Sequence, residues 1–388
     1  MSPSNGPSPI LLLLPSLVRA GAETQAISLA NGLARQGFAV HLATFGENLD
    51  QLEEIDRTQV VFHRLQRRGR FGWSLVWELV RLMRTHRFAV IHCTLQISLF
   101  YASLARWLSP LRGRPELVVA LHTTQNLSAR EERFDRWLYR PLIARCARVV
   151  FVCRAQATHW IERFPELAPR AAVVYNGVDA ERFAPAPAHE AAARALRATL
   201  GIEEDAPVLI CVARLRREKG HLLLLRALAE QPHRGLHLVL AGDGEMREQI
   251  EAQRRSLALS RWVHLLGDVQ DTRPLYALAD ASVLASTSVE TFSMAMLESL
   301  AMGTPMIATR MGGMGEAIEA DRTGWLVPPG DVPALSEALG ALAADRPKAA
   351  RLGATGRDRV CESFTVQAMI RDTAALIEQV APTTAPAR

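Results

Sequence analysis

The sequence of 388 residues is poor in lysine, in aromatic residues and in long hydrophobic runs. Its five cysteines are scattered without a CxxC pair, which excludes a disulfide framework or a Cys-ligated zinc site as the basis of the fold. No apolar run approaches the ~18–20 residues of a membrane span. The short run 10–14 has no basic stretch before it, as a signal peptide would. We expect a cytoplasmic protein that is either soluble or bound peripherally to the inner face of the plasma membrane.

Motifs of several binding chemistries are also missing. There is no Asp-x-Asp pair to hold a metal–diphosphate complex, no Walker A sequence and no HExxH. Gly242-Asp-Gly244 is not followed by the remaining glycine of a dinucleotide-binding loop. We therefore expect no bound metal, no cofactor and no nucleic-acid partner.

Positive charge is concentrated in the first half, where residues 1–180 hold 22 arginines and 14 acidic residues. Many of these arginines lie between Arg64 and Arg87, together with Trp73 and Trp77. A basic amphipathic helix with tryptophans can lie on anionic lipid. The alternative is an ordinary core-facing helix whose arginines are solvated.

Short apolar runs alternate with amphipathic stretches along most of the chain, which indicates βαβ units and parallel sheets. The expected strands are 10–14, 40–43, 60–63, 89–92, 117–122, 149–152, 172–175, 208–212, 236–240, 263–266, 281–285 and 305–309. The expected helices are 23–36, 73–87, 131–146, 219–230, 245–257, 272–279, 294–302, 331–345, 347–360 and 365–379.

A break rich in Ala and Pro at 183–193 divides this pattern into two α/β domains. We predict doubly wound, Rossmann-like domains at 1–180 and 181–364, a C-terminal helix 365–380 that packs back on the first, and a polar tail 381–388. In such folds ligands bind at the carboxyl ends of strands, so a cleft between the domains is the expected site.

Two cations stand at the end of one predicted strand. Arg214 and Lys219 follow the strand 208–212 and precede a helix. Arginine binds phosphate through two nitrogens, and a helix N-terminus offers free N–H groups, so this turn would suit a diphosphate. A solvated basic turn is the alternative.

Two carboxylates flank the start of another helix. Glu290 lies at the end of the strand 281–285 and Glu298 two turns inside the helix that follows. Carboxylates can accept hydrogen bonds from sugar hydroxyls, and the helix start between them can bind phosphate. Alternatively, Glu290 interacts with the helix dipole and Glu298 lies on the surface.

Four motifs occur together in a recognisable order. They are the Arg214/Lys219 turn, Glu290-x7-Glu298, the segment Gly303 to Glu316 and the segment Gly324 to Asp331. Together they resemble the retaining GT-B fold glycosyltransferases of group 1, family 4-like, which are related to bacterial sucrose, mannosyl and lipopolysaccharide transferases. The segment Val173 to Asp179 is similar to that family's crossover into the second domain.

The resemblance implies a role for each matching residue. Arg214 and Lys219 would neutralise the donor diphosphate as the leaving group gains charge. Glu298 would bind the ribose and Glu290 the transferred sugar. The loop residues Thr291, Phe292 and Ser293 would approach the distal phosphate, and the segment from Leu265 to Val269 would bind the base.

In the first half, Gly21 resembles the family's glycine loop near the donor phosphate, and His122 resembles the histidine that lines the sugar site. Each has an ordinary alternative, a turn glycine and a hydrogen-bonded core histidine. His92, at the end of another strand, is interpreted as structural.

The implied activity is transfer of a sugar from a nucleotide diphosphate sugar to an acceptor hydroxyl. The expected acceptor is a carbohydrate or a lipid-linked molecule, in polysaccharide, lipopolysaccharide or glycolipid biosynthesis. Alternatives are a sugar-nucleotide epimerase or phosphorylase on the same fold, and a non-catalytic nucleotide-sugar-binding partner.

Overall fold

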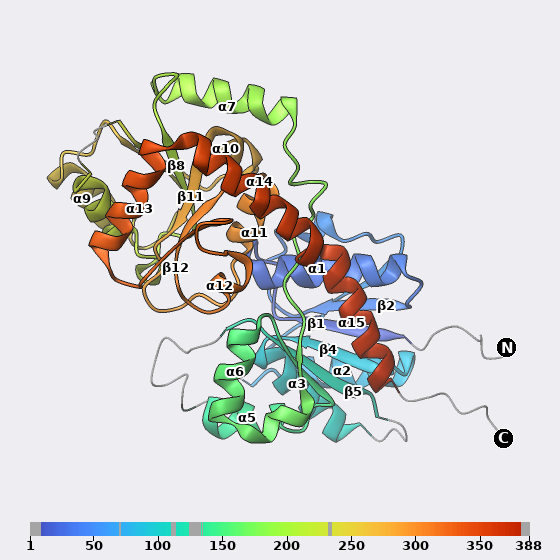
Figure 1. The fold of residues 1–388 in the computed structure, drawn as a ribbon. Helices are drawn as coiled ribbons and strands as arrows, with labels where there is room; N and C mark the ends of the chain where they lie inside the picture. Colours follow the sequence, from blue (N-terminus) through green and yellow to red (C-terminus); the bar gives the residue numbers. More distant parts are fainter. Residues whose placement is uncertain are drawn as a thin grey trace. The chain divides into compact units, whose positions relative to one another are not determined.

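The computed structural model describes residues 9–69, 71–109, 114–123, 133, 135–231 and 235–381. The chain forms two compact units (Figure 1). Unit 1 runs to Asn176 and takes in the C-terminal segment from Val366, and unit 2 is Gly177–Thr365. The first division therefore lies four residues before the boundary predicted at 180.

Unit 1 contains a parallel sheet of seven strands in the order β3-β2-β1-β4-β5-β6-β7. The strands are β1 (Ile10–Leu14), β2 (Val40–Thr44), β3 (Val60–Arg64), β4 (Val90–Thr94), β5 (Glu116–Leu121), β6 (Arg148–Phe151) and β7 (Ala171–Val173). Its helices are α1 (Gly21–Arg35), α2 (Trp73–His86), α3 (Gln96–Leu108), α5 (Arg140–Ile143), α6 (Arg154–Arg163) and α15 (Val366–Val380), with short helical turns η1 (Leu52–Glu54), η2 (Asp135–Tyr139) and η3 (Pro165–Arg170).

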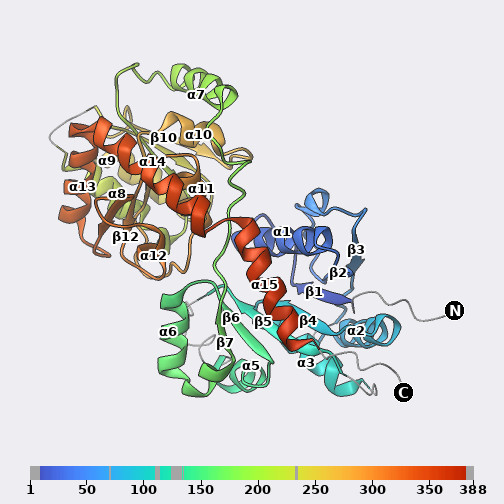
Figure 2. The ribbon, with the colours of Figure 1, turned by 45° about the vertical axis from the view of Figure 1, so that its right-hand side comes forward.

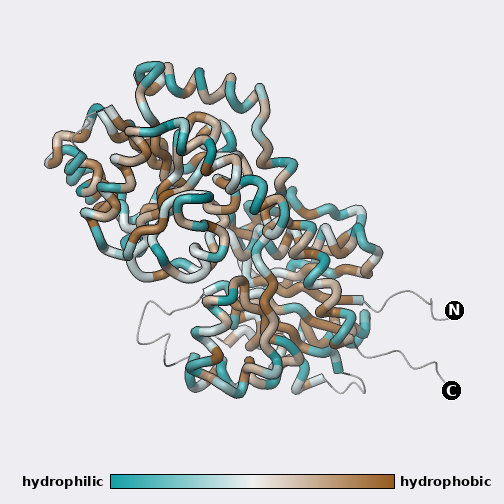
Figure 3. Tube along the Cα trace, viewed as in Figure 1, coloured by the Kyte–Doolittle hydropathy of each residue, from teal (hydrophilic) through white to brown (hydrophobic). Residues whose placement is uncertain are grey.

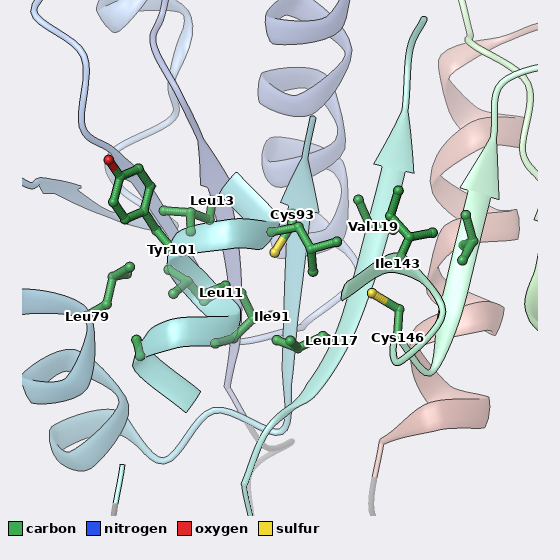
Figure 4. Packing of buried hydrophobic residues seen from close by; sticks show 14 of the residues in the cluster. Leu11, Leu13, Leu79, Ile91, Cys93, Tyr101, Leu117, Val119, Ile143 and Cys146 are labelled. Atoms are coloured by element: carbon green, nitrogen blue, oxygen red, sulfur yellow. The ribbon is translucent and has the colours of Figure 1, made fainter. Parts of the chain in front are cut away.

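Alternate residues of the central strands enter two cores on opposite faces of this sheet. One core joins β1, β4 and β5 to α2, α3 and α6, and Figure 4 shows Leu11 and Leu13 of β1 beside Ile91 and Cys93 of β4. The other joins the intervening residues to α1 and α15. Burial on both faces explains why these strands read as continuous apolar runs rather than alternating ones.

Helix α15 comes from the far end of the chain and packs against α1, at a steep angle to it in both views (Figures 1 and 2). The contact is close: a Cβ placed on Gly32 would stand 2.0 Å from Cδ1 of Ile370. The last helix of the chain is thus part of the core of unit 1.

Unit 2 repeats this architecture with six parallel strands in the order β10-β9-β8-β11-β12-β13. The strands are β8 (Val208–Val212), β9 (His237–Ala241), β10 (Val263–Gly267), β11 (Ala281–Leu284), β12 (Met306–Thr309) and β13 (Gly324–Val327). The helices are α7 (Pro187–Thr199), α8 (His221–Ala229), α9 (Arg247–Ser256), α10 (Arg273–Leu278), α11 (Met294–Ala301), α12 (Met314–Ala317), α13 (Val332–Ala344) and α14 (Arg346–Ser363), with the turn η4 (Arg217–Lys219). In each unit hydrophobic residues concentrate along the strands (Figure 3).

The structure corrects several predicted elements. The break at 183–193 contains the start of α7, whose alanine-rich sequence buries only Ala193 and so shows little apolar periodicity. Helices α3, α6 and α12 and strand β13 were not predicted. The helix predicted at 131–146 lies partly outside the described residues; its described part is the π-helical turn η2 followed by α5. Strand β5 ends at Leu121, one residue before His122.

Candidate functional site

The strand order of unit 2 reverses between β8 and β11, which lie side by side and parallel. At such a point the loops that leave the carboxyl ends of the two strands turn to opposite faces and leave a crevice in which ligands bind. The loop after β8 carries Arg214 and Lys219, and the loop after β11 carries Glu290. The fold therefore places two separately predicted motifs at one switch point.

Lys219 and Glu290 are in direct contact. The Lys219 Nζ lies 2.8 Å from Glu290 Oε2, and Ser286 Oγ donates a hydrogen bond of 2.9 Å to the same oxygen. The side chains of Lys219 and Glu290 are 23% and 9% exposed, so the pair is largely shielded from water. Arg214 is exposed in the same loop. The sequence analysis did not identify Ser286.

Gly220 brings the cationic loop against the end of β11. Its φ of 70° lies in the left-handed region, and an added Cβ would stand 1.9 Å from the carbonyl oxygen of Ala285. The amide of Thr287 donates to the carbonyl of Glu218 over 2.8 Å. Only glycine fits this approach, which holds Lys219 within reach of Glu290.

A second glycine supports the acidic loop from the opposite side. Gly312 has a φ of 47°, and a Cβ there would lie 2.1 Å from the carbonyl oxygen of Glu290. The next residue, Gly313, donates its amide to the Thr291 carbonyl over 2.6 Å. The glycine-rich segment after β12 thus packs on the backbone that carries Glu290 and the buried Thr291.

The glycine pair after β9 also belongs to this site, although the sequence analysis set it aside. A Cβ on Gly242 would stand 2.2 Å from the Ala213 carbonyl oxygen, and one on Gly244 would stand 2.6 Å from that of Leu215. The Leu215 amide donates to the Asp243 carbonyl over 3.0 Å. These glycines let the β9–α9 loop pack directly against the backbone around Arg214.

Helix α11 begins beside Glu290 and carries Glu298. Ser293 caps this helix, because its Oγ accepts the Met296 amide at 3.4 Å. Phe292 is buried, and its ring centroid lies 5.4 Å from that of Phe364. The loop between the two glutamates is therefore anchored by a helix cap and a core aromatic.

Glu298 is partly buried, which excludes the surface position that was the alternative for it. Its Oε2 lies 3.1 Å from the hydroxyl oxygen of Tyr276, a fully buried residue of α10. Burial raises the pKa of Glu298 to about 7, against the opposing effects of the Tyr276 hydrogen bond and of Arg182. The sequence carried no signal for Tyr276, since a tyrosine on a short helix is usually core.

Leu265 and Val269 lie further along the same sheet edge. Leu265 belongs to β10, the outermost strand, where the register shifts between Leu265 and Gly267. Both side chains are half-buried. The structure places them at the carboxyl end of β10, two strands from β8.

In unit 1 the strand order reverses between β1 and β4. Gly21 begins α1, after the loop that leaves β1, so it stands at this second switch point. His122 follows β5, next to β4. Gly21 and His122 thus lie at the carboxyl edge of the sheet in unit 1, as predicted, and the other site residues lie in unit 2.

The backbone on both sides of His122 is held by one buried side chain. Gln156 of α6 donates from Nε2 to the carbonyl oxygens of Leu121 (2.9 Å) and Thr123 (3.0 Å). Its Oε1 accepts the amide of Val152 over 2.8 Å. Burial and the neighbouring His92 lower the pKa of His122 to about 4, so the imidazole is neutral at pH 7. The sequence analysis did not identify Gln156.

The comparisons with known proteins agree across both units. Residues 193–359 match the family model "Glycosyl transferases group 1", and residues 19–182 match "Glycosyltransferase Family 4". The lipopolysaccharide core biosynthesis glycosyltransferase LpsE of Rhizobium meliloti is 34% identical over 45% of this chain and 50% of its own length. The GDP-mannose-dependent α-(1-6)-phosphatidylinositol monomannoside mannosyltransferase of Mycolicibacterium smegmatis is 33% identical over 54% of this chain and 56% of its own. The chain thus spans about half the length of these curated relatives.

Solved structures match over nearly the full length. HepE of Anabaena, in complex with UDP, superposes with a TM-score of 0.83 at 24% identity, covering 96% of this chain and 100% of that one. Sucrose-phosphate synthase of Thermosynechococcus elongatus gives 0.80 at 22% identity, covering 96% and 99%. At these identities the likeness establishes the fold.

Proposed function

The chain belongs to the glycosyltransferases of group 1 and family 4 and has the predicted GT-B fold, and on this premise we propose that it transfers a sugar from a nucleotide diphosphate donor to an acceptor hydroxyl with retention of configuration. The observation that carries the proposal is the Lys219–Glu290 contact at the switch point of unit 2. A cation for a diphosphate and an acceptor for sugar hydroxyls stand there side by side.

In this proposal the donor replaces the internal ion pair. The negative diphosphate attracts the Lys219 ammonium away from Glu290, and Arg214 adds a second positive charge. The freed carboxylate, still held by Ser286, accepts hydrogen bonds from the sugar. Both cations act most strongly when the sugar–phosphate bond breaks and charge grows on the leaving oxygen.

The transfer step is a front-face displacement. The acceptor oxygen bonds to the anomeric carbon, the bond from that carbon to the phosphate oxygen breaks, and the proton of the acceptor hydroxyl passes to the departing oxygen. No protein nucleophile is assigned. The neutral His122 would donate a hydrogen bond to a sugar hydroxyl, and Glu298 would hold the ribose.

Arg214 and Lys219 supply the positive charge, so we propose that transfer needs no divalent cation. Activity should survive exhaustive dialysis against a chelator. Loss of activity in the chelator, with rescue by Mg²⁺ or Mn²⁺, would contradict this part of the proposal.

The donor is best identified with a thermal-shift panel of UDP-glucose, GDP-mannose and ADP-glucose. The first two are chosen because a HepE structure contains UDP-glucose and the mycobacterial relative is named for its dependence on GDP-mannose, and ADP-glucose tests a third base. A ligand at 100 times its dissociation constant adds about 2.7 kcal/mol to the free energy of unfolding. If no nucleotide sugar raises the melting temperature, the proposal is wrong.

Glu290→Gln separates binding from transfer in this assay. The variant should bind the nucleoside diphosphate at least as tightly, because Lys219 no longer pairs with a carboxylate, and it should lose transfer, because Glu290 is the residue that contacts the sugar. Product analysis by NMR tests retention directly and also distinguishes the alternatives. An epimerised donor would indicate an epimerase, and a free sugar phosphate would indicate a phosphorylase. Binding without any turnover would indicate a non-catalytic nucleotide-sugar-binding partner.

The acceptor is proposed to be a carbohydrate or a lipid-linked molecule, reached at the cytoplasmic face of the plasma membrane. Trp73 and Trp77 are 53% and 58% exposed on α2, and Arg81 and Arg84 continue the same exposed stripe. Phe71, before the helix, is 69% exposed. Tryptophans beside arginines fit an anionic lipid surface, while the opposite face of α2 packs in the core. No helix of the described residues is long and apolar enough to cross a bilayer.

Liposome co-sedimentation tests this surface. Binding to anionic vesicles should fall steeply as salt is raised, and the double change Trp73→Ser with Trp77→Ser should abolish it without unfolding the domain. Binding that is equal on neutral and anionic vesicles would contradict the lipid assignment.

A further inference from the structure

Three histidines from separate elements meet on one face of the sheet in unit 1. They are His41 of β2, His63 of β3 and His86, the last residue of α2. One ring nitrogen of each lies within 4.8 Å of the others, and His41 Nδ1 is 2.8 Å from His63 Nε2. The ring centroid of His86 is 4.3 Å from that of His41.

The strand register explains why the first two rings adjoin. Ala43 pairs with His63 across parallel strands, and His41 stands two residues before Ala43, so all three side chains point to the same face. Ala43 belongs to the core that packs on α2. The end of α2 then brings in His86, and Phe88 closes the inner side with its ring 5.1 Å from that of His41.

The chemistry of this cluster is unusual for a core. Within the described ranges, no carboxylate forms an ion pair or a hydrogen bond with any of the three imidazoles. His41 is buried, whereas His63 and His86 are partly exposed. The cluster therefore combines three nitrogen donors, an apolar floor and an open side.

We propose that His41, His63 and His86 form a binding site for a divalent transition metal of the zinc class, with water as the fourth ligand. Three histidines and a water make a common tetrahedral Zn²⁺ site with Zn–N bonds of about 2.0–2.1 Å. In that geometry ring nitrogens stand about 3.3 Å apart, so binding requires the His41–His63 contact of 2.8 Å to open by about half an ångström and any more widely spaced pair, within the 4.8 Å limit, to close.

The ion would join the outermost strand of the sheet to its neighbour and to the end of α2. His41 stands near the amino end of β2, whereas Gly21 and His122 follow the carboxyl ends of their strands. The ion would thus lie away from the residues of the candidate donor site. This inference does not rest on the proposed function. It concerns metal binding by the three histidines, whereas the proposed sugar transfer uses no metal.

The test is titration of the untagged, chelator-treated full-length chain with Zn²⁺ by calorimetry and with Co²⁺ by visible absorption. Cys361 is exposed and is replaced by serine throughout to remove a competing thiol. We expect one equivalent to bind, a tetrahedral Co²⁺ spectrum and a higher melting temperature with Zn²⁺. His63→Ala and His86→Ala should each weaken binding by about 10²-fold or more.

The pair His237 and His264 in unit 2 offers a matched control. Their rings are also stacked, with nitrogens 2.9 Å apart, but among the described residues no third histidine joins them. His264→Ala should leave Zn²⁺ binding unchanged. Melting curves in chelator show whether each variant still folds.

Two outcomes would overturn the proposal. Absence of saturable binding by the folded chain would mean that the cluster is a hydrogen-bonded histidine group only. Equal affinity in the folded His86→Ala variant would place the ion elsewhere. Loss of transfer in chelator would instead contradict the metal-free mechanism. The titrations with Zn²⁺ and Co²⁺ would still decide whether the three histidines bind the metal.

Discussion

At the scale of single residues, Glu298 shows how surroundings change the chemistry of one carboxyl group. Glu290 lies in the loop before α11 and Glu298 is the fifth residue of that helix, and Glu290 pairs with a lysine while Glu298 faces a buried tyrosine hydroxyl. A carboxyl group with a pKa near 7 is partly protonated at neutral pH. The two glutamates of the motif are therefore in different electrostatic states.

The raised pKa of Glu298 predicts a pH dependence of stability. Between the unfolded value of 4.5 and about 7, the folded chain holds a proton that the unfolded chain has lost. The stabilisation is complete below about pH 4.5 and is lost as pH rises to about 7, on the order of 2–3 kcal/mol. Denaturant unfolding from pH 4.5 to 8 measures it.

Glu298→Gln should remove this part of the pH dependence, because glutamine does not titrate. The exposed Glu337→Gln controls for the loss of one surface carboxylate and should leave the curve unchanged. A Glu298→Gln curve that runs parallel to the wild-type curve from pH 4.5 to 8 would show that Glu298 does not titrate in this window.

Ser286 gives a second prediction at this scale. Its hydroxyl positions Glu290 Oε2, and a hydrogen bond to a charged group contributes roughly 1.5–3 kcal/mol. Ser286→Ala should therefore slow transfer about tenfold or more and leave nucleoside diphosphate affinity nearly unchanged. Steady-state kinetics and calorimetry measure the two quantities.

Ser282→Ala is the matched control, since Ser282 is a buried serine of β11, the strand that precedes Ser286, and it contacts Ser299 rather than Glu290. Its activity per folded molecule should stay near that of the wild type. Equal losses in both variants would mean that packing, not the hydrogen bond to Glu290, explains the effect.

At the scale of elements, the site depends on loops that approach one another more closely than any side chain allows. Gly220, Gly242 and Gly312 each face a neighbouring carbonyl oxygen at a distance that excludes a Cβ. The strands supply the frame, and these glycines set how near the loops after β8, β9 and β12 come to Glu290 and Arg214.

Gly220→Ala tests this arrangement. The change forces a Cβ into the left-handed region and onto the Ala285 carbonyl, so the β8–α8 loop must move away from β11. We expect a loss of stability of more than ~1 kcal/mol and a weaker affinity for nucleoside diphosphate, measured by unfolding and calorimetry.

Gly201→Ala separates backbone strain from the close approach. Gly201 has a similar φ of 64°, and nothing lies within 4 Å of its missing Cβ. Its stability should fall by only about 1 kcal/mol, with ligand affinity unchanged. If both variants bind ligand normally, the loop contact is not needed for the donor site.

At the scale of the whole molecule, each unit has its own core, and the chain returns to the first unit at its end. Ile370 of α15 is buried against Gly32 of α1. Ile370→Ala should cost about 2–5 kcal/mol and lower the unfolding temperature of unit 1 alone. Calorimetric scans follow the two transitions.

Leu342 lies in the core of unit 2, so Leu342→Ala should lower the unfolding temperature of unit 2 alone. A bound nucleoside diphosphate should raise the unfolding temperature of unit 2 and leave that of unit 1 unchanged. A single transition displaced equally by both variants would mean that the units unfold together.

The sequence by itself determined the class of fold and the composition of the candidate site. The strands buried on both faces appear as uninterrupted apolar runs such as 10–14 and 208–212, because both sides of each strand need hydrophobic partners. The motifs around Lys219 and Glu290 could be recognised in the sequence because their charged residues and glycines follow the ends of strands at characteristic spacings. The roles of these residues toward the donor stay predictions.

Only the tertiary structure decided which of these residues meet and what surrounds them. The Lys219–Glu290 contact joins positions 71 residues apart, and it arises from the pairing of β8 with β11. The pKa of Glu298 depends on Tyr276 and on burial, which no local pattern encodes. Helix α7 escaped prediction because local periodicity records an apolar face, and α7 buries only Ala193. The cluster of His41, His63 and His86 likewise results from strand register and from where α2 ends, because proximity between distant residues is a property of packing.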